Sequence, residues 1–262
     1  MFGGTAGDLP MTETCDLCHL SALEPIYEPA ASRQGLTVYL CSGCGLVQSL
    51  PRAEGPVRSI VDRNNVQSDK ASRTKACLSL IRAHADLDSC LCVLHTGSNR
   101  GPFARALLTA APKAILTSVE PDEDGRLLEA HFDIVYSCRT IAQRVSPAST
   151  LAEHWRALKP DGLLIIDAPN IAQIGSDHTA EEWFIDDHLY HFSRRTLARL
   201  LEITGFEIVA GADVRDGENL LFAARKRNEP MRSRARDFAE VDAALTLIDS
   251  YVTARVSAQR AA

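Results

Sequence analysis

Residues 91–101 of the chain read LCVLHTGSNRG, and this stretch decides the fold. It begins with the apolar run Leu91–Leu94, which is typical of a strand buried on both faces of a parallel sheet. The chain then turns at Gly97 and Gly101, and apolar residues at helical spacing follow over 102–108. A strand, a glycine turn and a helix in this order predict an α/β fold with a doubly wound, Rossmann-like sheet.

The same turn is a candidate binding site. Glycines let the backbone approach a ligand closely, and the N-terminus of the following helix offers free N–H groups. A tight turn without any ligand needs the same residues, so the pattern alone leaves both interpretations open. Downstream, a second predicted strand over 114–119 ends at Glu120, and an acid at this place commonly binds ribose hydroxyls. The alternative is an acid at a solvated strand end.

Two cysteine pairs, each with two intervening residues, lie near the amino terminus: Cys15 with Cys18, and Cys41 with Cys44. Two such turns can present four thiolates to one tetrahedral ion, so the spacing predicts a structural Zn²⁺ site with no open position for catalysis. Free thiols and a redox pair are the alternatives. A redox pair requires a thioredoxin-like unit, which the sequence does not show. His19 follows the first pair, but four sulfurs already complete the shell.

The other four cysteines lie in apolar surroundings, and we interpret them as core residues: Cys77, Cys90, Cys92 and Cys138. Eight cysteines used in this way indicate a metal site in a reducing compartment and not a disulfide framework. The first 14 residues lack the charged and apolar regions of a signal peptide. We therefore expect a cytoplasmic protein.

Composition excludes several classes of function. The chain has 262 residues, of which 45% are hydrophobic, and a formal net charge of −6. A net negative charge does not indicate a nucleic-acid-binding protein. No apolar run approaches the ~18 residues of a membrane span. The length fits one large domain, or one medium domain with a small one.

Five segments carry a resemblance to one family. They are CGLVQ (44–48), GSN (97–99), VEP (119–121), LKPDGLLIIDAPN (158–170) and EEWFIDDHLYHFS (181–193). In this order they resemble class I S-adenosylmethionine-dependent methyltransferases, and most of all the sugar C-methyltransferase branch with its amino-terminal zinc domain. The resemblance extends from about residue 12 to about residue 227. It implies that the zinc domain helps to cover the substrate side.

The resemblance also assigns roles to single residues. It implies that Gly97, Ser98, Asn99 and Gly101 hold the methionine half of S-adenosylmethionine and that Glu120 holds its ribose. Asp187 and His188 occupy the Glu-His positions of a family segment that lines the active site. An acid beside a histidine could raise its basicity, so that His188 serves as a general base. The alternative is that Asp187 and His188 cap the helix that begins near Ser193.

The chain departs from the family pattern at several places. His95 stands where the family carries an acid, Arg144 replaces a histidine, and Ile185-Asp186 replace a Tyr-His of the sugar-specific members. The interval 121–131 is too short for a helix and a strand together. We therefore expect one short helix over 123–130 and a lost strand.

The sequence predicts four segments: a four-cysteine zinc-binding domain over 12–50, a connector over 51–72, an α/β domain over 73–228 and a carboxyl-terminal helix within 229–262. We expect a helix over 72–85 and antiparallel pairing of the last two strands, 206–210 and 220–224. The tail helix, 230–256, has apolar residues at steps of three and four. We expect it to pack within the chain, with a homodimer seam as the alternative.

The leading hypothesis is an S-adenosylmethionine-dependent methyltransferase acting on a small-molecule or sugar-linked substrate. The alternative is a non-catalytic scaffold that has lost the adenine loop and binds a protein partner. His95, Arg144 and the short interval 121–131 favour this alternative. An NAD-dependent enzyme is disfavoured because its G-x-G-x-x-G pattern is absent.

Overall fold

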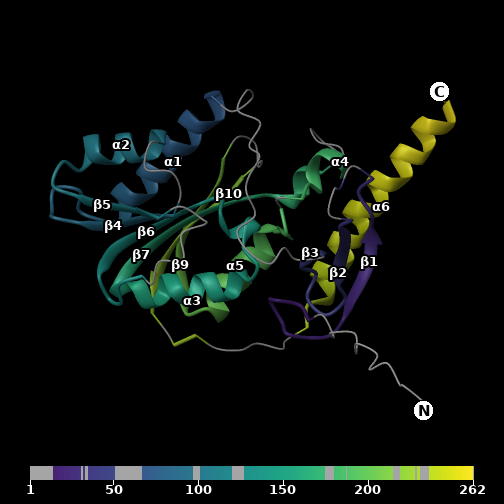
Figure 1. Ribbon diagram of the computed structural model, residues 1–262, viewed down its shortest axis with the longest axis horizontal. Helices are drawn as coiled ribbons and strands as arrows, with labels where there is room; N and C mark the ends of the chain where they lie inside the picture. The colour runs from purple at the N-terminus through teal and green to yellow at the C-terminus, as the bar shows by residue number, and fades with distance from the viewer. Residues whose placement is uncertain are drawn as a thin grey trace, which may run out of the picture.

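The chain folds around two β-sheets (Figure 1). The structure is a computed structural model, and it describes residues 14–30, 32, 35–50, 67–96, 101–119, 127–174, 180–186, 188–214, 219–227, 229–230 and 236–261. No helix in these ranges is long and apolar enough to cross a membrane.

The larger sheet has six strands in the order β5-β4-β6-β7-β10-β9. The strands are β4 (Cys92–Thr96), β5 (Ile115–Val119), β6 (Phe132–Cys138), β7 (Leu158–Pro169), β9 (Phe206–Val214) and β10 (Asn219–Lys226). Neighbours among β5, β4, β6 and β7 are parallel, whereas β10 is antiparallel to both β7 and β9. The predicted Rossmann-like α/β sheet with an antiparallel end is confirmed.

Helices cover both faces of this sheet (Figure 1). On one face lie α1 (Gln67–His84) and α2 (Pro102–Ala110), and on the other α3 (Pro147–Ala157) and α5 (Arg194–Ile203). Alternate residues of β7 pack on opposite faces of the sheet. Leu163 and Ile165 belong to the core under α1 and α2, whereas Leu164 and Ile166 belong to the core under α3 and α5. This two-sided burial explains why the central strands are continuously apolar.

The interval after β5 differs in part from the prediction. Residues 120–126 lie outside the described residues, and 127–131 form a turn where the end of a helix was predicted. The backbone N–H groups of Ala130 and His131 donate to the carbonyls of Arg156 and Ala157, at 2.8 and 2.9 Å. These bonds to the end of α3 replace helical hydrogen bonds. Within the described ranges no strand lies beyond β5, and the expectation of a lost strand falls partly on residues outside these ranges.

Residues 159–162 lie inside β7 as an irregularity in its pairing. Phe132 pairs with Leu158 and Ile134 pairs with Leu163, so the residues between them are looped out of the ladder. Asp161 has a φ of +63°, and a Cβ on Gly162 would lie 2.9 Å from the Lys159 carbonyl oxygen.

The smaller sheet has the order β1-β2-β3-β8 and is antiparallel throughout. Its strands are β1 (Leu23–Tyr27), β2 (Thr37–Cys41), β3 (Val47–Leu50) and β8 (Tyr190–His191). The amino-terminal segment thus takes its fourth strand from a distant part of the chain. Three short elements, η1 (Ile141–Gln143), η2 (Ile171–Gln173) and α4 (Ala180–Trp183), complete the connections. The proposed domain limits stay a prediction, although α1 begins inside the segment assigned to the connector.

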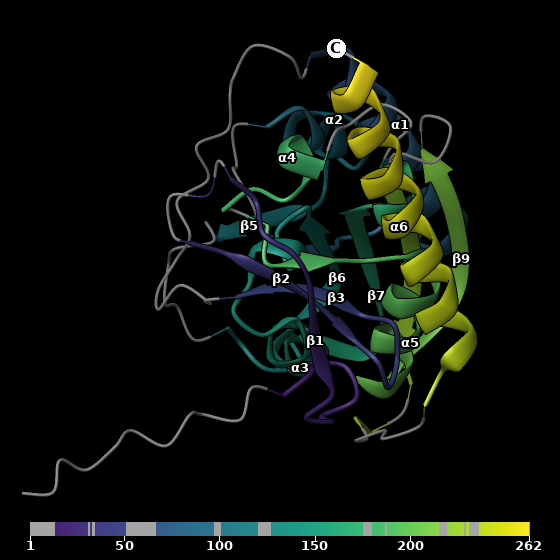
Figure 2. The ribbon, with the colours of Figure 1, turned by 90° about the vertical axis from the view of Figure 1, so that its right-hand side faces the viewer.

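The last helix, α6 (Phe238–Ala261), packs against the smaller sheet (Figure 2). Among the described side chains of α6, the buried apolar ones are Val241, Ala244 and Ile248, which join the core of β2 and β3. Phe238 and Leu245 also belong to the apolar residues at steps of three and four, but they are 60% and 37% exposed because they lie at the edge of this stripe. The predicted intramolecular packing is confirmed for the first half of the helix.

Two glycines of the amino-terminal segment give a matched test of this packing. Gly45 has a φ of +76°, and a Cβ there would lie 2.5 Å from Glu240 Cγ and 2.8 Å from its carbonyl carbon. Gly35 has a φ of +64° but no neighbouring atom within 4 Å of such a Cβ. We expect Gly45→Ala to lower the free energy of unfolding by about 2–4 kcal/mol and Gly35→Ala by about 1 kcal/mol. Urea denaturation of both variants measures the difference, and equal losses would contradict a close contact with α6.

Candidate functional site

The four predicted cysteines form one buried cluster. All Sγ atoms of Cys15, Cys18, Cys41 and Cys44 lie within 4.8 Å of one another. The Cys15–Cys44 and Cys18–Cys41 sulfur pairs are each 3.5 Å apart. A tetrahedral zinc ion with bonds of about 2.3 Å requires sulfur separations of about 3.8 Å. The cluster therefore has the size of a four-sulfur metal site.

Electrostatics favour a cation in this cluster. Hydrogen bonding to the Cys18 thiol, then to Cys41 and Cys44, with burial in addition, raises the pKa of Cys15. Hydrogen bonding to Cys15 and Cys18 lowers the pKa of Cys41. Four buried thiolates cannot all ionise without a positive charge among them. In the described part of the chain, neither a histidine nor a carboxylate joins the cluster, so its donors are sulfur alone.

The interpretation of the other cysteines as core residues is only partly correct. Cys77 is buried, Cys92 is half-buried, and Cys90 is exposed because it lies in the turn before β4. The side chain of Cys138 lies outside the described residues.

A second group of polar residues lies at the carboxyl edge of the larger sheet. Chain connections diverge between β4 and β6, and this is where ligands bind in open α/β sheets. The Oγ1 atoms of Thr96 and Thr140 are 3.3 Å apart, and Ser137 Oγ lies 3.1 Å from Thr140 Oγ1. Gly101 precedes α2 in an extended conformation, with no side chain to block the free N–H groups of the helix.

Four of the predicted cofactor-binding residues, Gly97, Ser98, Asn99 and Glu120, lie outside the described residues. Of the predicted cradle only Gly101 is described. Binding of S-adenosylmethionine by these residues thus stays a prediction.

His95 lies in β4 and turns towards the α1–α2 side. Its ring stacks on Tyr136 at a centroid distance of 5.3 Å and lies 5.5 Å from the ring of Phe103. The imidazole is 3% exposed, and burial lowers its pKa to about 4. Among the described residues its buried Nδ1 atom has no hydrogen-bond partner. His95 is therefore neutral at pH 7 and brings no charge to the edge of the sheet.

A buried ion pair at this edge was not predicted. Asp167 in β7 is fully buried, and its Oδ2 atom lies 3.4 Å from Nε of Arg73 in α1. Its Oδ1 atom accepts a hydrogen bond of 3.0 Å from the backbone N–H of Arg139. The signal in the sequence was an acid inside the apolar run Leu163–Pro169, since a buried acid requires partners.

The segment with the predicted catalytic pair packs beside this edge. The Leu189 N–H donates to the Ala142 carbonyl at 2.9 Å, and the His188 N–H donates to the Ile185 carbonyl at 3.0 Å. The His188 ring is half-buried, and burial, followed by the charge of Arg139, lowers its pKa to about 4. These surroundings oppose the expected rise in basicity. Asp187 lies outside the described residues, so a catalytic role for the pair stays a prediction.

His191 connects this segment to the smaller sheet. Its Nε2 atom lies 2.9 Å from Ser49 Oγ, and its ring contacts Phe184 edge-on at 4.7 Å. Burial, followed by the nearby His188, lowers its pKa well below the usual range. A neutral, buried and hydrogen-bonded His191 is consistent with a structural role.

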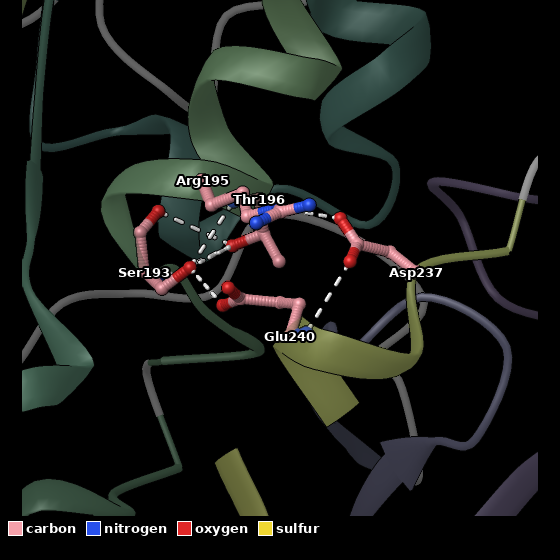
Figure 3. A network of polar contacts seen from close by, with 5 residues as sticks. All are labelled: Ser193, Arg195, Thr196, Asp237 and Glu240. Carbon is pink, nitrogen blue, oxygen red and sulfur yellow. Dashed lines mark hydrogen bonds and ion pairs between the residues drawn. The ribbon is translucent and has the colours of Figure 1, made fainter. Parts of the chain in front are cut away.

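The helix after this segment is capped by its own residues. Ser193 Oγ accepts from the Thr196 N–H and Thr196 Oγ1 accepts from the Ser193 N–H, which forms a capping box. Figure 3 shows Glu240 hydrogen-bonded to Ser193 and Asp237 paired with Arg195 at 2.6 Å. In the described residues, His188 takes no part in the cap, so the alternative explanation of this histidine as a capping group loses its support.

Comparisons with known proteins agree with this architecture. A family model described as a methyltransferase domain matches residues 66–210. No curated protein matches the chain.

Solved structures of similar fold include Burkholderia thailandensis 1,6-didemethyltoxoflavin-N1-methyltransferase, with bound 1,6-didemethyltoxoflavin and S-adenosylhomocysteine. It has 20% identity and a TM-score of 0.52 over 78% of this chain and 100% of that chain. A chain from the Haloferax volcanii complex of the Trm112 methyltransferase activator with a methyltransferase has 14% identity and a TM-score of 0.50. It covers 62% of this chain and 93% of that one. At these identities the likeness shows the fold.

Proposed function

The chain belongs to the methyltransferase-domain family, with a class I fold, and from this premise we propose that it is an S-adenosylmethionine-dependent methyltransferase acting on a small-molecule or sugar-linked substrate. The observation that carries the proposal is the carboxyl edge of β4 and β6. It combines small hydroxyl side chains, an uncharged imidazole and the open N-terminus of α2 in one place. The Burkholderia enzyme, which holds a small heterocycle and S-adenosylhomocysteine, supports the substrate class by analogy.

The cofactor would lie across this edge. Gly97, Ser98, Asn99 and Gly101 would hold its methionine half, and Glu120 would accept hydrogen bonds from its ribose. When bound, the cofactor supplies an activated methyl group on a sulfonium. The protein contributes mainly position, by aligning the acceptor atom with that methyl group.

His188, with Asp187, is the proposed proton acceptor. With a pKa of about 4 its imidazole is neutral at pH 7 and therefore free to take a proton, although it is a weak base in its present surroundings. A negatively charged acceptor molecule beside Arg139 would raise this pKa, since the charge of Arg139 helps to lower it.

Cys15, Cys18, Cys41 and Cys44 are the proposed ligands of one structural Zn²⁺ ion. The smaller sheet that contains this cluster holds His191 through Ser49 and pairs with β8. We infer that the metal keeps the 188–193 segment in place and takes no part in chemistry. Clustered thiols of this kind require a reducing environment, and we place the protein in the cytoplasm.

The alternative is a non-catalytic scaffold of the same fold that binds a protein partner. The observation that favours it is His95, whose neutral ring fills a position where the family carries a charged side chain.

Titration calorimetry of S-adenosylmethionine and S-adenosylhomocysteine into zinc-loaded protein distinguishes the two functions. We expect micromolar dissociation constants, and a loss of at least about tenfold in Glu120→Ala because a pair of charge-assisted hydrogen bonds disappears. Glu202→Ala, at an exposed position of α5, is the matched control and should bind as tightly as the wild type. If folded wild-type protein gives no heat with either ligand, the enzyme hypothesis fails and the scaffold remains.

A further inference from the structure

Arg139, the residue directly after β6, has an unusual backbone. Its φ is +53°, in the left-handed region that side chains other than glycine rarely adopt. Its N–H donates to Asp167 twice, to the carbonyl oxygen at 3.2 Å and to Oδ1 at 3.0 Å. The buried Asp167, itself paired with Arg73, thus holds Arg139 in this conformation. A conformation stabilised in this way fixes the direction of the side chain.

The guanidinium of Arg139 has no partner among the residues that the structure describes. Arg139 is half-buried as a whole residue, and in the described part of the chain its guanidinium forms neither a hydrogen bond nor an ion pair. A partly desolvated charge without a counter-ion is unfavourable. Two other basic side chains near this edge, besides Arg144, differ from it, because Arg73 is paired with Asp167 and His188 is neutral at pH 7.

Arg139 lies close to His188, the proposed proton acceptor. The segment 188–190 lies on the segment 142–145, since Leu189 bonds to Ala142 and the Tyr190 hydroxyl donates to the Val145 carbonyl at 2.9 Å. Arg139 is near enough to His188 to lower its pKa. The proposed proton acceptor and a cation with no partner among the described residues therefore lie at the same end of the sheet.

We propose that Arg139 binds an anionic group, a carboxylate or a phosphate, of the methyl acceptor, which deepens the proposed function and rests on it. A guanidinium can hold either group with two parallel hydrogen bonds and so orient the molecule as well as attract it. Bound in this way, the acceptor lies beside the imidazole of His188. The substrate class is thus an anionic small molecule. The other anionic group that Arg139 could bind is the carboxylate of the cofactor.

Inorganic phosphate is the probe that tests this site. Its dissociation constant is measured from ³¹P line widths with zinc-loaded full-length protein, alone and saturated with S-adenosylhomocysteine. We expect millimolar affinity that persists with the cofactor product bound. Arg139→Gln should weaken it at least about tenfold and Arg139→Lys less, because lysine keeps the charge but loses the paired geometry. Arg82→Gln, at an exposed position of α1, should leave it unchanged.

The remaining outcomes overturn the proposal. Phosphate displaced by S-adenosylhomocysteine would assign Arg139 to the cofactor carboxylate. Phosphate that does not bind, or binds equally to folded Arg139→Gln, would exclude an anion site at this residue. Failure of the proposed function is recognised separately. In that case S-adenosylhomocysteine gives no heat in calorimetry, whereas the phosphate titration of the same sample still shows whether anion binding depends on Arg139.

Discussion

Cys41→Ser is expected to abolish stoichiometric zinc binding and to unfold the smaller sheet. Structural zinc sites supply on the order of 10–16 kcal/mol of folding free energy, which matches or exceeds the whole stability of a typical domain. Cys41 ends β2 and contributes one of four sulfurs, so its loss opens the metal shell and the end of the hairpin together. The measurements are zinc content by mass spectrometry and hydrogen exchange over residues 35–50. Cys90→Ser, at an exposed thiol outside the cluster, is the control and should keep one zinc ion.

The effect should extend beyond the metal. The Asp237 N–H donates to the Gly43 carbonyl at 2.8 Å, and Val47 in β3 pairs with His191 in β8. Faster exchange is therefore expected in residues 236–248 and 189–192 as well, whereas β4 and β6 should keep their protection. Zinc-free Cys41→Ser with α6 still protected would contradict this coupling, and a full complement of zinc would contradict the four-sulfur site.

The sequence contains much of this architecture because its signals are local. The run Leu91–Leu94 and its glycine turn predict a buried strand and helix, and the cysteine spacing predicts the cluster. By contrast, the pairing of Val47 with His191 depends on how two parts of the chain meet, and no short-range pattern encodes it. Phe238 follows the same rule, since helical spacing marks an apolar stripe but not which of its edges is covered.

The polar residues of the site were harder to predict. Sequence motifs predicted the glycine loop and His188 as site residues. Arg73 and Asp167 could not be predicted in this way, because the packing of α1 on the sheet brings them together. The placement of Arg139 follows from a backbone conformation, which the sequence does not display. Polar site residues of this kind are identified in the structure from their burial and their partners. In the sequence, their one signal is a charged residue within an apolar strand.

Asp167→Ala is expected to lower the free energy of unfolding by about 3–5 kcal/mol, because it leaves the Arg73 guanidinium buried without its carboxylate. The two side chains are 0% and 8% exposed, so water cannot replace the lost partner. The variant also removes the side-chain acceptor for the Arg139 N–H, which keeps its bond of 3.2 Å to the backbone carbonyl oxygen of residue 167. Urea denaturation of zinc-loaded protein at pH 7 measures the loss.

A double-mutant cycle separates the ion pair from the other contacts of Asp167. Arg73→Met should cost a similar amount, and Arg73→Met with Asp167→Ala should cost clearly less than the two single losses together, since no unpaired charge remains. Lys159→Met provides the exposed comparison, because Lys159 pairs with Asp133 at 2.8 Å while 41% exposed and should matter by less than about 1 kcal/mol. Additive losses in the cycle would mean that Asp167 and Arg73 act independently. The conformation of Arg139, and with it the proposed anion site, would then need another support.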